Sequence, residues 1–183
     1  MTLSLHLVIT TDDAGGARMA EEWIEKLAHA IKGKDHEAAE QDAAATRRAE
    51  LINHEGPIFW RSFADFLKKY TEEMRGALDG DVTAAVISFT FQPQSQRIDI
   101  HKSAYPYIMF NASPGYGPNQ SVSMQYLKTN PKQPQNIVQK MQAIPCRFEV
   151  SHHHKVFLHL DGKEFPEPQH AAKYLIEKLF TLE

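Results

Sequence analysis

The chain has 183 residues, of which 42% are hydrophobic and 23% charged, and its formal net charge is −3. This composition is that of an average folded protein, which argues against a disordered or fibrous chain, and the acidic net charge argues against a nucleic-acid-binding surface. Because the chain has no run of about 18 apolar residues and Met1–Thr10 does not resemble a secretory signal, we expect a cytoplasmic protein with no membrane contact.

The first part of the chain has its apolar residues at helical spacing. Leu3–Ile9 alternates like a short strand, or forms a docked extension. A helix that ends near Gly33 is then predicted by the spacing of Ala20, Trp23, Ile24, Leu27 and Ile31. An alanine-rich stretch, residues 38–49, follows after a short linker. We therefore expect an antiparallel helical hairpin, and an exposed arm that awaits a partner is the alternative.

A heptad-like series of apolar residues continues into the most hydrophobic segment of the chain. It runs from Ala45 to Tyr70, and the large side chains of Phe59–Leu78 are those expected of a core helix. Pro57 lies within the series, and because proline removes a helical hydrogen bond we predict a kink or a brief interruption near residues 53–56. We divide the chain into an N-terminal appendage with the hairpin, residues 1–55, and a body, residues 56–183, which together make one domain.

The change in pattern comes near Gly80. After it nine of the ten prolines occur and apolar residues alternate at period two, which is typical of strands. The expected elements are strands near residues 85–91, 98–100, 105–111 and 122–126, a short helix over 137–144, one bent strand or two over 147–160, an Asp161-Gly162 turn and a closing helix. The sequence thus predicts an α+β fold. An antiparallel, mostly meander sheet of about four to six strands packs against a long core helix and a C-terminal helix, with the hairpin before them.

Four tyrosines are the candidate ligand-binding or partner-binding residues. Tyr116 lies in a loop restricted by prolines and flanked by two glycines, and Tyr105, Tyr107 and Tyr126 come from adjoining strands. A tyrosine has an apolar ring with a polar end, which suits recognition surfaces. If these side chains face away from the core they form an aromatic surface, and if they face inward they are ordinary core residues.

Histidines form the candidate metal site. The chain has ten, and the cluster that could bind zinc comprises His152, His154 and His159. On an extended strand His152 and His154 point the same way, whereas His159 points to the other face. Two imidazoles are a minimal chelate, and a zinc site needs three or four ligands, so a solvated bend between strands is the alternative interpretation.

These features favour a binding function over catalysis. The sequence has no GxSxG, HExxH or CxxC motif, and its carboxylate pairs lie at a helix start or on polar helix faces. We expect a non-catalytic binding or adaptor domain for a protein partner, for a second copy of the chain, or for a small apolar ligand between helix and sheet, without a cofactor. The alternative function is a metal-assisted hydrolase that uses His152, His154 and His159.

Overall fold

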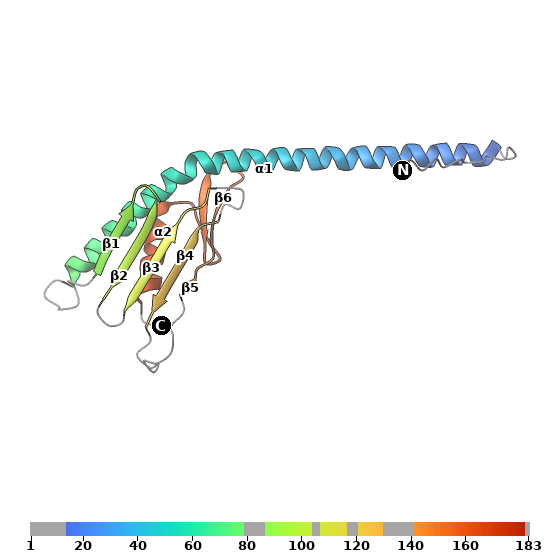
Figure 1. The fold of residues 1–183 in the computed structure, drawn as a ribbon. Helices are drawn as coiled ribbons and strands as arrows, with labels where there is room; N and C mark the ends of the chain where they lie inside the picture. Colours follow the sequence, from blue (N-terminus) through green and yellow to red (C-terminus); the bar gives the residue numbers. More distant parts are fainter. Residues whose placement is uncertain (1–13, 79–86, 104–106, 117–120, 130–140, 182–183) are drawn as a thin grey trace, which may run out of the picture. The chain divides into compact units, whose positions relative to one another are not determined.

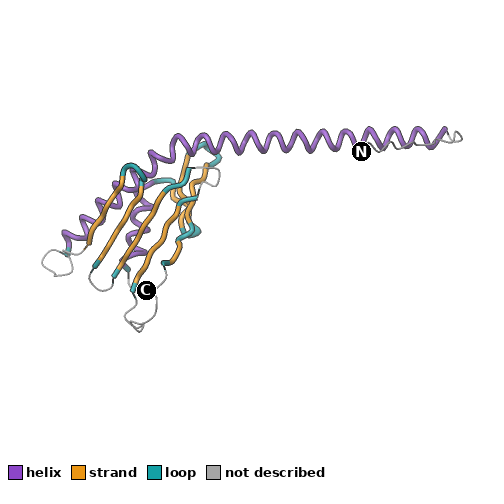
Figure 2. Tube along the Cα trace, in the orientation of Figure 1, coloured by secondary structure: helices purple, strands orange, loops and turns teal. Residues whose placement is uncertain are grey.

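The structure, a computed structural model, describes residues 14–78, 87–103, 107–116, 121–129 and 141–181, and side chains from Trp23 onward. Over these residues it contains two helices and eight strands, which confirms the predicted α+β fold with antiparallel sheets (Figures 1 and 2). Their bounds are α1 Ala14–Ala77, β1 Ile87–Gln92, β2 Arg97–Lys102, β3 Ile108–Ser113, β4 Ser123–Lys128, β5 Gln142–Ala143, β6 Cys146–Val150, β7 Val156–Leu160, β8 Lys163–Phe165 and α2 Pro168–Phe180. The predicted Leu3–Ile9 strand lies outside the described residues.

The chain divides into two compact units, residues 1–45 and residues 46–183, and α1 contributes to both. In the first unit α1 is one helix that passes through Gly33 without a turn, so the predicted helical hairpin is wrong. A glycine inside a helix costs about 1 kcal/mol relative to alanine. That cost is too small to end a helix whose neighbouring residues are mostly Ala, Glu, Lys and Gln, all strong helix formers.

In the second unit α1 continues through Pro57 as helix, so the helical path predicted on both sides of the proline is confirmed and the brief interruption is wrong. The helix is held on both sides of the proline by burial. Ile52 is fully buried before it and Phe59 is 8% exposed after it. Burying one such side chain stabilises by roughly 1.5–3 kcal/mol, so two of them offset much of the roughly 3 kcal/mol that an interior proline costs.

The five-stranded sheet is a meander in the order β1-β2-β3-β4-β5, and β6, β7 and β8 form a second antiparallel sheet (Figure 1). The two sheets are linked where the chain passes from β5 to β6. The Ile144 amide donates to the Met124 carbonyl (2.9 Å), and the Val122 amide donates to the Cys146 carbonyl (3.0 Å). Pro145, which has no N–H group, separates β5 from β6.

One part of the predicted helix over 137–144 is wrong, because Gln142 and Ala143 form β5. Residues 130–140, where this helix would begin, lie outside the described part of the chain. The bend predicted within residues 147–160 is present as a hairpin, with β6 and β7 joined by the turn that contains His152–His154.

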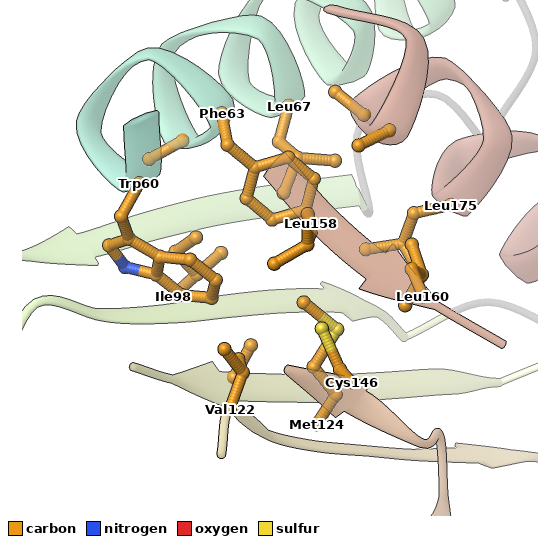
Figure 3. Packing of buried hydrophobic residues seen from close by; sticks show 14 of the residues in the cluster. Trp60, Phe63, Leu67, Ile98, Val122, Met124, Cys146, Leu158, Leu160 and Leu175 are labelled. Atoms are coloured by element: carbon orange, nitrogen blue, oxygen red, sulfur yellow. The ribbon is translucent and has the colours of Figure 1, made fainter. Parts of the chain in front are cut away.

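The core lies between α1, α2 and the inner faces of the two sheets (Figure 3). From α1 come Trp60, Phe63 and Leu67, all fully buried, and they meet Ile98 from β2 and Leu158 from β7. The indole N–H of Trp60 donates to the carbonyl of Gln96 in the β1–β2 turn (2.7 Å). The aromatic helix predicted from Phe59–Leu78 is therefore the core helix.

Candidate functional site

Seven large hydrophobic side chains are exposed among the described residues, and four of them share one short part of α1. Trp23 is 64% exposed, Ile24 56%, Leu27 46% and Ile31 52%. At 100° per residue these four positions fall on one side of the helix. We call Trp23, Ile24, Leu27 and Ile31 the apolar stripe.

The apolar stripe continues a regular spacing. Ile24 and Ile31 are seven residues apart, and the next two positions at this interval are Ala38 and Ala45, both exposed. The other side of the helix carries charges of both signs, for example Glu25 and Lys32. A narrow apolar seam with mixed charges around it is the pattern of helices that pair with helices.

The predicted tyrosine site is divided between two faces of the sheet. Tyr107 is 51% exposed, beside Met109 on the outward side of β3, whereas Tyr126 packs against the core from the inward side of β4. The Tyr126 hydroxyl donates to the Gln142 side chain (2.6 Å). Tyr105 lies outside the described residues.

Tyr116 packs inward, against α1 and β6. Its ring stacks on Phe148 with centroids 5.6 Å apart, and its hydroxyl donates to the Gln96 side chain (2.6 Å). Burial raises the pKa of this hydroxyl well above its usual range. The ring also lies over Gly56, where a Cβ would be only 3.0 Å from Tyr116 Cδ1. These contacts give Tyr116 a packing role.

The predicted histidine cluster lies in and beside the β6–β7 turn. His152, His153 and His154 are exposed there, and His154 has a left-handed backbone (φ 56°). His159 is half-buried on β7, opposite Arg147 of β6. Over the part of the chain that the structure describes, no three His, Cys, Asp or Glu side chains are placed to hold a metal ion together.

A groove runs between α1 and β1, the first strand of the sheet. It has a volume of about 430 Å³, and the residues on its walls include Ile58, Arg61 and Asp65 of α1 with Phe91 and Pro93. A smaller hollow, of about 60 Å³, also lies between α1 and β1, and its walls include Lys68 and Glu72 of α1 with Ile87 and Phe89 of β1. The region between α1 and the inner faces of the sheets is filled by core side chains (Figure 3), and the small apolar ligand between helix and sheet stays a prediction.

The sequence does not single out the residues of the apolar stripe or of this groove as a site. In the predicted hairpin the stripe would be buried, and only the alternative of an exposed arm leaves it open to a partner. The groove depends on which strand forms the edge of the sheet, but one signal was available: β1, Ile-Ser-Phe-Thr-Phe-Gln, contains no charge and no proline.

Comparisons with protein-family models, with curated proteins and with solved structures give no match to this chain. Within the described ranges, neither helix has a stretch that is both long and apolar enough to cross a membrane. The functional proposals therefore depend on the geometry of the surfaces above.

Proposed function

We propose that this chain is a cytoplasmic, non-catalytic binding domain whose apolar stripe binds a helix of a partner protein. The observation that carries the proposal is the exposure of Trp23, Ile24, Leu27 and Ile31, each between 46% and 64%. Apolar side chains gathered on one exposed surface are typical of sites that bind another protein. The presence of a tryptophan supports a binding surface further, because tryptophan is enriched among the residues that contribute most of the binding energy at protein interfaces.

The spacing of the apolar residues supports a helix as the bound element. The seven-residue interval from Ile24 to Ile31, Ala38 and Ala45 is that of helices that pack along a shared seam. The alanines would let a second helix approach closely, and Ile24 and Ile31 would supply the buried area. The stripe is surrounded by both acidic and basic residues, which suits a protein better than an anionic membrane, since membrane-surface helices are rich in Lys and Arg.

The proposal is tested with a photo-crosslinking residue at Ala28, beside the stripe, to identify the partner, followed by binding measurements on the purified pair. Ile24→Ser/Leu27→Ser should weaken binding at least about tenfold, because each side chain contributes roughly 1.5–3 kcal/mol when buried. Glu25→Ser/Lys32→Ser, on the opposite side of the helix, is the matched control and should bind like the wild type. Unchanged affinity of the stripe variant, or crosslinks only to a second copy of the chain, would refute the proposed partner.

The alternative function is a metal-assisted hydrolase that uses His152, His154 and His159. It requires further ligands to join these imidazoles, since a catalytic zinc usually has three protein ligands. Zinc content after purification without an affinity tag, together with the melting temperature before and after zinc addition, tests it. One bound zinc per chain with a raised melting temperature would favour the hydrolase over the binding domain.

A further inference from the structure

We infer that β1 pairs with β1 of a second copy of this chain, in an antiparallel dimer that joins the two five-stranded sheets edge to edge. This interface is distinct from the apolar stripe, and it lies within residues 46–183. The inference depends on three features. They are the unpaired edge of β1, the charge pattern of α1 beside it, and the fact that the centre of the charged row of α1 lies beside the centre of β1.

The edge of β1 is open to pairing. Among the described strands β1 pairs only with β2, and Figure 1 places it at the end of the sheet. Every second residue of an edge strand directs its N–H and C=O groups away from its neighbour. Proteins usually protect such edges with charges, prolines, bulges or short length. The six residues of β1 include no charge and no proline, and their register with β2 is unbroken.

The sequence of β1 suits pairing with itself. With the two-fold axis at Thr90, Thr90 lies opposite its own copy, and Phe89 lies opposite Phe91 of the second copy. Phe89 and Phe91 are half-buried on the inward side, whereas Thr90 is exposed on the outward side. This register keeps every side chain on its own face, and roughly four to six backbone hydrogen bonds can form. Because β1 is uncharged, no like charges oppose each other.

The wall of α1 beside β1 is also self-complementary. Arg61, Asp65, Lys68 and Glu72 line the groove and the smaller hollow and alternate in sign along the helix, and all four are exposed. We place a two-fold axis midway between Asp65 and Lys68. About this axis Arg61 of one copy lies opposite Glu72 of the second copy, and Asp65 lies opposite Lys68 of the second copy. Each of these pairs is of opposite charge, and the symmetry generates each pair twice.

The two-fold axis of the strand pairing and the two-fold axis of the charged row of α1 coincide along the strand direction. Asp65 and Phe91 both line the groove, and Lys68 and Phe89 both line the smaller hollow. The midpoint of the helix row therefore lies beside the midpoint of the strand, Thr90. One two-fold axis thus serves both the strand and the helix, which selects a second copy of the chain over an unrelated peptide as the occupant.

The test is the dimer dissociation constant of the full chain by sedimentation equilibrium. The wild type should dimerise. Thr90→Lys, which places two ammonium groups opposite each other at the axis, should weaken the dimer roughly fivefold or more. The matched control is Gln125→Lys, an exposed residue of β4 in the same cross-strand row as Thr90, and it should dimerise like the wild type. Melting temperatures of both variants should match the wild type.

A charge exchange tests the helix row separately. Arg61→Glu and Glu72→Arg should each weaken the dimer roughly fivefold, and the double exchange should restore it, because it re-forms both opposite-charge pairs. A wild type that stays monomeric at about 0.5 mM, or a dimer unaffected by Thr90→Lys, would overturn the inference. The stripe variant Ile24→Ser/Leu27→Ser should leave this dimer intact, so failure here and failure of the proposed partner binding are distinguishable.

Discussion

Replacing Gly56 with alanine gives the sharpest test of how the loop around Tyr116 is held. Gly56 is buried in α1, where alanine would normally stabilise the helix by about 1 kcal/mol. The new Cβ, however, would lie 3.0 Å from Cδ1 and 3.1 Å from Cε1 of Tyr116. The sign of the effect therefore depends on whether the tyrosine ring can move away.

The ring has little room to move. Phe148 stacks on it, with centroids 5.6 Å apart, and its hydroxyl is tied to Gln96 at 2.6 Å. Overpacking a filled core costs about 1–3 kcal/mol, which exceeds the helix gain. We expect Gly56→Ala to lower the free energy of unfolding by about 1 kcal/mol. In a Tyr116→Ala background the clash is absent, so the same substitution should raise it by up to about 1 kcal/mol.

Urea unfolding followed by the fluorescence of the buried Trp60 measures both effects. With a denaturant slope of about 1–3 kcal/mol/M, a change of about 1 kcal/mol shifts the midpoint by roughly 0.3–1 M. The two backgrounds should shift in opposite directions. An equal shift in both would mean that Gly56 and Tyr116 are not coupled, and the packing argument would be wrong.

Two further perturbations test the contacts that hold α2 and the β1–β2 turn. Lys178 and Tyr174 of α2 both donate to Oδ2 of Asp161, at 2.6 and 2.7 Å, and these hydrogen bonds, that from Lys178 first, lower the pKa of Asp161 below its usual 3.8. Asp161→Asn should lower the free energy of unfolding by about 1–2 kcal/mol at pH 7. A depressed carboxyl pKa contributes stability that is full above the unfolded-state value and is lost as pH falls through the lower folded-state value, so this difference should shrink as pH falls below 3.8 in an acid titration of urea midpoints. A constant difference down to the acid limit would contradict it. Trp60→Phe removes the hydrogen bond to Gln96 and should cost about 1–2 kcal/mol, measured by urea unfolding followed by far-UV circular dichroism, because the variant lacks the buried tryptophan. A loss below about 0.5 kcal/mol would mean that this bond contributes little.

The sheet and its core were predictable because period-two alternation identifies the buried face directly. Ile98 and Ile100 alternate with polar residues in the sequence, and both are fully buried on the inner face of β2. The strand pairs followed because consecutive strands joined by short loops usually pair. The predicted meander implies that the first strand lies at an edge, as β1 does, but the groove beside β1 was not predictable, since the sequence does not say where α1 lies relative to that edge.

The tyrosine prediction shows a different limit. Alternation places Tyr107 and Tyr126 on faces of their own strands, but the register between β3 and β4 decides whether those faces coincide. In the structure Tyr126 lies opposite Phe110, on the inward side, and Tyr107 lies outward. A shift of one residue in register would have reversed one of them, and a turn of uncertain length does not fix that shift.

The failure of the predicted hairpin carries an argument about function. A hairpin would have buried the apolar stripe against residues 38–49, but that stretch offers mainly alanines, whose small side chains supply little apolar area. Reversing the chain at Gly33 would also have broken about four helical hydrogen bonds. The continuous helix is favoured on both counts, and it leaves Trp23, Ile24, Leu27 and Ile31 exposed. Because the alanine-rich stretch is too weak a surface to cover the stripe from within the helix, the stripe is exposed among the described residues, and it is this surface that the proposed partner helix would cover.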